Sequence, residues 1–150
     1  MYKRGPKKMI LIIPVAILVA LIFFFLIPTE PQKAKKVVDA FYTYEQNAQF
    51  SAAYDLFHPK MQERNSRGRY IENRGKFVGV EGFPYSLSKP KKVKDWSMSE
   101  GSEPFETAYK VTVTKEIRDQ DNGNYRLEQD VYVTQELETN DWKILWDFNE

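Results

Sequence analysis

The first pattern in the chain is an unbroken apolar run from Met9 to Ile27. None of these nineteen residues has a charged, amide or hydroxyl side chain. At about 1.5 Å per residue, a helix of this length crosses a hydrocarbon core of roughly 30 Å. A helix also satisfies its own backbone hydrogen bonds without water, and Pro14 near its start predicts a kink and not an end. We therefore predict a transmembrane helix over 9–27, with Met9 and Ile27 as the limits of the membrane anchor.

The charges beside this run predict its orientation. Four basic residues and no acidic residue precede it, whereas three lysines and three acidic residues lie in the twenty positions after it. The positive-inside rule then makes 1–8 a basic cytoplasmic tail and places residues 28–150 outside the cytoplasm.

A cleaved signal peptide is the alternative to an anchor for this apolar run. Its apolar core usually has about 7 to 15 residues and ends at a small-x-small site, and the residues from Phe24 to Thr29 have no such pattern.

After the run, apolar residues recur every three or four positions, which is typical of helices. Thr29 and Gln32 have the spacing of a capping box, so a first helix is predicted over about 31–48. A shorter second helix is predicted over 51–57, ending before a proline, and a third over 66–75.

From residue 75 onward the helical period is lost. Residues 75–90 are rich in glycine and proline and are predicted to form one long loop. Apolar and polar residues then alternate, which indicates strands with one buried face. The predicted strands are 105–118, 125–137 and 142–148, with Leu137 and Phe148 on their inner faces. A weaker strand is predicted near 93–99, with Trp96 and Met98 pointing inward.

The loop between the two long strands predicts how they pair. A three-residue loop at 121–123 places Ile117 opposite Leu127 and keeps one face apolar, whereas a two-residue turn would reverse the faces. By the same test, a two-residue turn at Asn140 and Asp141 places Leu137 opposite Ile144.

Helices followed by an antiparallel meander, without βαβ alternation, indicate an α+β fold. We predict an N-terminal transmembrane helix followed by a cone of two to three helices packed on a curved antiparallel sheet of about four strands. The 123 residues after the run suit one extracytoplasmic domain, 28–150. The chain has no cysteine, which excludes disulfides, zinc–thiolate sites and a cysteine nucleophile.

The order of elements resembles that of the nuclear-transport-factor-2-like superfamily, over about residues 31–148. The phrases that contribute to the resemblance are Tyr54-Asp55-Leu56-Phe57-His58-Pro59 in the second helix and Trp142-Lys143-Ile144-Leu145-Trp146-Asp147 in the last strand. Among membrane-anchored members, the chain is similar to the N-terminal domain of methicillin-resistance-type penicillin-binding proteins. It is also similar to single-span channel subunits of conjugation and type IV secretion machines. The resemblance implies a cystatin-like cone, and it assigns no functional residue because no motif matches position by position.

The sequence predicts no catalytic, cofactor-binding or metal-binding residue, and therefore no enzyme and no cofactor. Ser86 and Lys89 have a Ser-x-x-Lys spacing, but they lie in the glycine- and proline-rich segment without the companion motifs of transpeptidases. His58, the single histidine, precedes a proline at a helix end, which favours a surface or capping role. Four polar residues interrupt the apolar strand faces and are candidates for lining the cone: Tyr109, Lys115, Gln129 and Gln135.

Charge is distributed unevenly along the chain. Residues 60–94 hold ten basic and three acidic residues, whereas residues 95–150 hold five basic and fourteen acidic ones. The basic segment predicts a face for an anionic partner, either anionic lipid or a wall polymer, with a solvated face as the alternative. Its members are Arg64, Arg67, Arg69, Arg74, Lys76, Lys89, Lys91, Lys92 and Lys94. The segment has no recognisable motif of aromatic and basic residues of the kind found in nucleic-acid binding sites, which argues against a nucleic-acid partner.

These patterns together predict a single-pass protein of the bacterial cell envelope, with its folded domain outside the cytoplasm. We expect it to be a non-catalytic scaffold or protein-interaction subunit of cell-wall or conjugative-transfer machinery, with the lipid bilayer and envelope proteins as partners. The alternative is a binding module that holds a small ligand in the cone or an anionic polymer on the basic face. The pattern leaves the oligomeric state open.

Overall fold

The computed structural model describes residues 14, 15, 17, 18, 27–75, 84–119 and 123–149. Residues 14, 15, 17 and 18 are helical and exposed. Most of the predicted membrane anchor, Met9 included, lies outside the described residues. Within the part of the chain that is described, no helix is both long enough and apolar enough to cross a membrane.

The first helix of the domain, α2 (Glu30–Gln46), begins where its capping pattern predicts. The backbone N–H of Thr29 donates to Gln32 Oε1 at 2.8 Å, and a proline lies in the first turn, where no intrahelical N–H bond is needed. The helix ends two residues before the predicted limit, because Ala48 adopts a left-handed φ of 55°.

Three shorter helices follow α2: α3 (Phe50–Asp55), α4 (Pro59–Arg64) and α5 (Arg67–Gly75). Helices α3 and α5 agree with predicted helices. Helix α4 was not predicted, so the described part of the domain has more helices than the expected two or three. Pro59 ends the preceding segment, and it also occupies the first turn of α4, where its fixed φ suits a helix start. The sequence pattern indicates only the terminating role of this proline, so α4 was not predicted.

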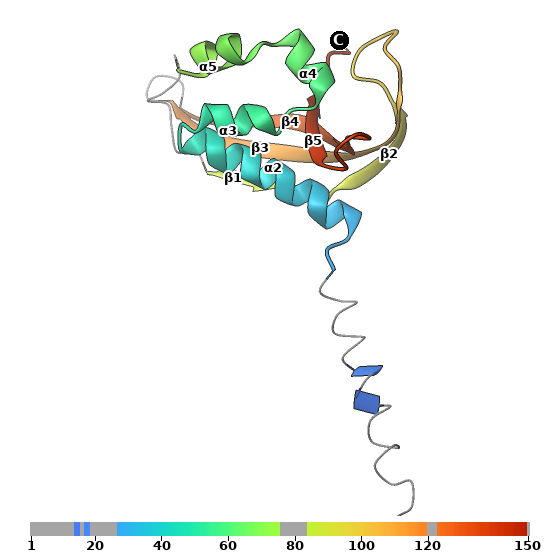
Figure 1. The fold of residues 1–150 in the computed structure, drawn as a ribbon. Helices are drawn as coiled ribbons and strands as arrows, with labels where there is room; N and C mark the ends of the chain where they lie inside the picture. The colour runs from blue at the N-terminus through green and yellow to red at the C-terminus, as the bar shows by residue number, and fades with distance from the viewer. Residues whose placement is uncertain (1–13, 16, 19–26, 76–83, 120–122, 150) are drawn as a thin grey trace, which may run out of the picture.

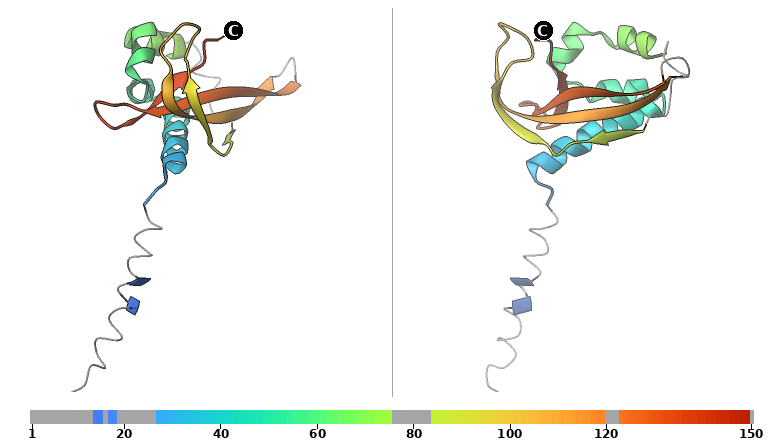
Figure 2. Two further views of the ribbon diagram at one scale, coloured as in Figure 1. Left: turned by 90° about the vertical axis from the view of Figure 1, so that its right-hand side faces the viewer. Right: turned by 180° about the vertical axis from the view of Figure 1, so that it is seen from behind.

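The described strands form one antiparallel sheet, with α2 lying across it (Figures 1 and 2). They are β1 (Tyr85–Leu87), β2 (Lys91–Trp96), β3 (Phe105–Asp119), β4 (Gly123–Gln135) and β5 (Trp142–Trp146). Their order is β1-β3-β4-β5, and β2 pairs with the other half of the same side of β3. The α+β class is therefore confirmed. The strand count of about four and the long loop at 75–90 are corrected, since β1 lies inside that loop.

Both predicted registers are wrong, although the predicted faces are preserved. Lys115 lies opposite Leu127, two positions from the expected pairing of Ile117 with Leu127. Ile144 lies opposite Val133, four positions from the expected pairing with Leu137. A shift by an even number leaves every side chain on its own face, so alternation alone does not distinguish these registers.

The end of β4 accounts for the second shift. The strand stops at Gln135, and residues 136–141 form a turn in which Glu136 N–H donates to the Asp141 carbonyl at 2.8 Å. Leu137, predicted to face inward, is 92% exposed in this turn, and Phe148 after β5 is also exposed. These two inward placements are corrected.

The space between α2 and the sheet is filled by aromatic rings. Phe57, completely buried, lies 5.3 Å from Phe41, 5.8 Å from Tyr54, and 5.1 Å from both Tyr70 and Trp146 between ring centroids. Such tilted and edge-to-face contacts add to the free energy of burial. The core therefore joins α2, α3, α5 and β5 through one phenylalanine.

The sheet is also covered on its second face at one end. Residues 131–134 of β4 point alternately to the two faces of the sheet, and all four are buried. On the second face, Trp96 stacks on Tyr132 with 3.9 Å between ring centroids. Met98, in the segment after β2, is buried too. The inward placement of Trp96 and Met98 is therefore confirmed, and this segment contributes a second layer to the core.

Candidate functional site

The structure brings two of the four predicted lining residues together, at the end of the sheet where α2 finishes. Tyr42 of α2 donates its hydroxyl to Gln129 Oε1 at 3.1 Å, and Lys115 Nζ lies 4.6 Å from the centre of the Tyr42 ring. Burial lowers the pKa of Lys115, with Arg74 adding to the decrease. Burial raises the pKa of Tyr42.

A carboxylate and two further side chains complete this group. Glu45 of α2 accepts a hydrogen bond from the Tyr70 hydroxyl and forms an ion pair with Arg74, Nε to Oε2, at 3.2 Å. Burial raises the pKa of Tyr70, and the neighbouring Glu45 charge adds to the increase. We call these six residues the polar cluster: Tyr42, Glu45, Tyr70, Arg74, Lys115 and Gln129.

The chemistry of the polar cluster is that of a hydrogen-bonded network. Because both tyrosine pKa values are raised, the hydroxyls of Tyr42 and Tyr70 stay protonated at neutral pH and act as donors. Glu45 is 12% exposed and already accepts from two side chains. The cluster is thus arranged so that its buried polar groups satisfy one another.

One buried donor near the polar cluster has no acceptor among the described residues. The indole N–H of Trp146 is buried without a hydrogen-bond partner there. The Arg74 guanidinium lies 5.8 Å from the centre of the Trp146 ring. An unsatisfied buried N–H is uncommon, because it loses its bond to water without replacement.

The other two predicted lining residues lie apart from the cluster. The buried Tyr109 donates its hydroxyl to Glu30 Oε2 at 2.7 Å, in the first turn of α2. Burial and this carboxylate raise the pKa of Tyr109 to about 12. Gln135 is exposed, and its amide donates to the Asn140 carbonyl at 2.8 Å in the β4–β5 turn.

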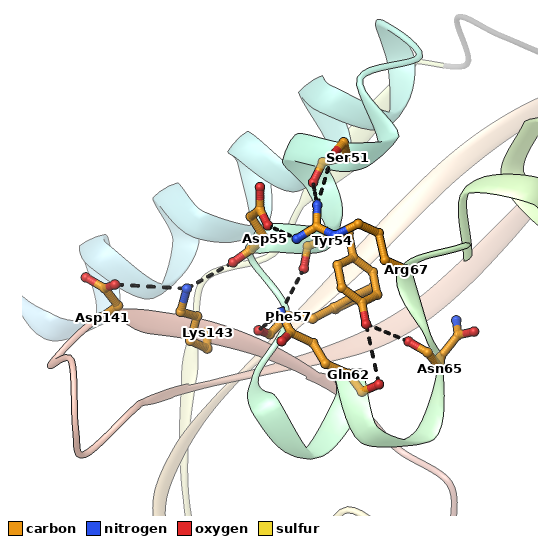
Figure 3. Close-up of polar contacts among 9 residues, drawn as sticks. All are labelled: Ser51, Tyr54, Asp55, Phe57, Gln62, Asn65, Arg67, Asp141 and Lys143. Atoms are coloured by element: carbon orange, nitrogen blue, oxygen red, sulfur yellow. Dashed lines mark hydrogen bonds and ion pairs between the residues drawn. The ribbon is translucent and has the colours of Figure 1, made fainter. Parts of the chain in front are cut away.

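Three of the four arginines of the predicted basic face are used in contacts within the domain. Arg64 donates to Ser99 Oγ at 2.8 Å and lies over the Phe148 ring, and Arg74 belongs to the polar cluster. Arg67 donates to the hydroxyl and carbonyl of Ser51 and to the Asp55 carboxylate (Figure 3). These residues connect α4 and α5 to the rest of the domain, and this structural role was missed in the sequence.

Figure 3 shows how α3, α4, α5 and β5 meet at this point. The Tyr54 hydroxyl donates to the Asn65 carbonyl at 2.9 Å, and the Arg67 guanidinium lies 4.7 Å from the centre of the Tyr54 ring. From β5, Lys143 Nζ donates to the Asp55 carbonyl at 2.9 Å. The segment that begins at Tyr54 therefore has a structural role, because it joins these helices to β5.

The remaining basic residues are exposed and lie in different places. Arg69 is on α5, whereas Lys89, Lys91, Lys92 and Lys94 are in β2 and the segment before it. Lys76 lies outside the described residues. Apart from Lys76, the predicted residues are therefore distributed over α4, α5, β2 and the segment before β2.

His58 is the N-cap of α4. It is 8% exposed, its Nδ1 accepts the backbone N–H of Lys60 at 3.2 Å, and its ring packs edge-to-face against Phe105. Burial lowers the pKa of His58. The capping role is thus confirmed, and the alternative of a surface residue is not.

The cap predicts a pH-dependent stability. Because the pKa of His58 is lower in the folded chain than its ordinary value of 6.5, the unfolded chain binds the proton first as the pH falls below that value. Protonation also removes the acceptor on Nδ1. Between about pH 7.5 and 5.5 we expect the free energy of unfolding to fall relative to that of His58→Asn, since asparagine caps without titrating. Urea unfolding of both chains at several pH values measures this difference, and parallel pH profiles would contradict it.

No group of three or more histidine, aspartate or glutamate side chains is positioned to hold a metal ion in the part of the chain that the structure describes. The sequence matches no protein-family model and no curated protein.

Proposed function

We propose that the chain is a single-pass membrane protein whose residues 28–150 lie outside the cytoplasm and act through contact with other proteins. The proposed role is that of a non-catalytic scaffold subunit in a bacterial envelope assembly. The apolar run at 9–27 and the basic residues before it support the anchor and its orientation. The α+β order of elements supports a place in the nuclear-transport-factor-2-like superfamily.

The observation that carries this proposal is the filled interior of the domain. Phe41, Phe57, Tyr70 and Ile144 are each completely or almost completely buried between the helices and the sheet. The polar cluster beside them pairs its groups with one another. Because these side chains occupy the space where a cone would hold a substrate, recognition is assigned to the outer surface.

Among the described residues, Leu137 is the most exposed large apolar side chain on that surface. It is 92% exposed at the tip of the β4–β5 turn, where its side chain contributes nothing to the core. Large apolar side chains on projecting turns are suited to a pocket of a partner, and such anchors supply much of the binding free energy of an interface.

Site-specific crosslinking in intact cells tests this proposal. With a photoreactive residue in place of the exposed Glu138, we expect one reproducible protein adduct. The adduct should be lost in Leu137→Asp, whose stability changes by no more than about 0.5 kcal/mol because the site is exposed. Protease added to the intact cells should remove the domain together with the adduct. The same residue in place of the exposed Asn73 on α5 serves as the control position.

An adduct of equal yield in Leu137→Asp would contradict the contact role of Leu137. A domain that resists protease until the cells are broken would contradict the proposed orientation.

A binding module for a small anionic ligand is the second candidate. Among the described residues, the indole N–H of Trp146 has no acceptor and the ammonium of Lys115 lies against the Tyr42 ring without an ion-pair partner, and both observations favour this candidate. A shift of the Trp146 indole resonance during titration with inorganic phosphate would favour this candidate over the first.

A further inference from the structure

The bend between β1 and β2 lies beside the first turns of α2 (Figure 1). Two contacts place it there. Lys35 Nζ of α2 donates to the Leu87 carbonyl at the end of β1, at 3.4 Å. Lys92 of β2 pairs with Tyr109, whose hydroxyl donates to Glu30 at the start of α2. Segments about fifty residues apart in sequence therefore share this end of the domain.

Five exposed lysines lie on the segments that meet at this end. We call them the membrane-proximal lysines: Lys33, Lys36, Lys89, Lys91 and Lys92. None of them forms an ion pair with another residue in the ranges 27–75, 84–119 and 123–149. The nearby carboxylates have other partners, because Glu30 accepts from Tyr109 and Asp39 accepts from the Tyr85 hydroxyl at 2.8 Å. The lysine charges are thus left for an external anion.

The distance to the predicted anchor is short. Only Pro28 and Thr29 separate Ile27 from the first residue of α2. At about 1.5 Å per residue, Lys36 is about 9 Å along the helix from Glu30. This is comparable with the Debye length of about 8 Å at physiological ionic strength, so the charges in the first turns of α2 are close enough to interact with a bilayer surface at the end of the predicted anchor.

We propose that the membrane-proximal lysines bind the anionic phosphate headgroups of the phospholipids around the anchor. This inference rests on the anchor of the proposed function. The contact holds the lysine-bearing end of the domain against the bilayer. The β4–β5 turn with Leu137 then points to one side. Phospholipid is preferred to a wall polymer because the lysines lie at the end of the domain where the chain enters the bilayer, within reach of its headgroups.

Nanodiscs containing the full-length chain test this proposal. The chain has no cysteine, so Ser86→Cys on β1 provides one fluorescent label near the lysines, and Glu100→Cys provides a distant reference. Both positions are exposed. Lipids with a nitroxide headgroup quench the label when the domain rests on the bilayer. We expect about twofold stronger quenching at position 86 when phosphatidylglycerol is added to phosphatidylcholine, and no change at position 100.

Matched charge variants identify the lysines. Lys89→Gln with Lys91→Gln should abolish the increase caused by phosphatidylglycerol. The control, Arg69→Gln with Arg126→Gln, removes two exposed charges from α5 and β4 and should leave the increase intact. High salt should reverse the quenching, since the contact is electrostatic.

The possible outcomes distinguish a failure of the lysine contact from a failure of the proposed membrane anchor. A chain that does not remain with nanodiscs of either composition overturns the anchor, and the inference with it. A chain that is anchored but equally quenched in both compositions overturns the lysine contact alone. Release of the quenching by soluble polyglycerol phosphate at the same phosphate concentration would overturn the choice of lipid in favour of a wall polymer.

Discussion

The Phe57→Ala chain should lose about 3 to 5 kcal/mol in its free energy of unfolding. The ring is completely buried among four other aromatic rings, and its removal leaves a cavity that these rings are unable to fill without moving. Since a domain of this size is stabilised by about 5 to 15 kcal/mol, much of the population should unfold at moderate urea concentration. The midpoint of urea unfolding, followed by tryptophan fluorescence, measures the loss.

The control for this experiment is Phe148→Ala. Phe148 is 40% exposed and contacts Arg64 at the surface, so its truncation should cost less than about 1 kcal/mol. Equal losses for the two variants would show that Phe57 does not have the central position in the core that we describe.

The Glu45→Ala chain is expected to lose about 2 to 4 kcal/mol. This substitution removes the acceptor of the Tyr70 hydroxyl and the partner of Arg74 in a site where Glu45 is only 12% exposed. The cost is dominated by the polar groups left behind, because an unpaired charge shielded from water is destabilising. Urea unfolding again provides the measurement.

A double variant distinguishes an unpaired charge from lost packing. Glu45→Met combined with Arg74→Met removes both charges and keeps most of the side-chain volume, so it should recover a large part of the stability lost in Glu45→Met alone. Additive losses would contradict the direct coupling of Glu45 with Arg74.

Much of the fold follows from periodicity. The start of α2 could be predicted from Thr29 and Gln32, and the strands from alternation, because capping and face selection depend on residues close in sequence. The strand registers could not be predicted from the sequence, since a shift of two residues leaves Val111 and Val131 on the same buried face. Helix α4 was missed because Pro59 is compatible with both an end and a beginning.

The site was less predictable than the fold. Lys115 and Gln129 were identified as interruptions of an apolar face, and the structure places both against Tyr42. Glu45 carried a similar signal, since it follows Phe41 and Tyr42 at helical spacing on a buried side of α2. Its partners were not predictable, because Arg74 reaches it from α5 and looks like one more member of a basic segment.

The margins of the sheet have a consequence for how copies of this domain behave when they are crowded together. Beyond β5, the segment Leu56–His58 runs alongside and exchanges backbone hydrogen bonds with Ile144, so this margin is already occupied. The opposite margin is formed by β1 and β2, and the lysines of β2 repel a second copy. Strand-by-strand fusion into cross-β aggregates is therefore disfavoured at β5 and at β2, and neighbouring copies should stay folded at high local density.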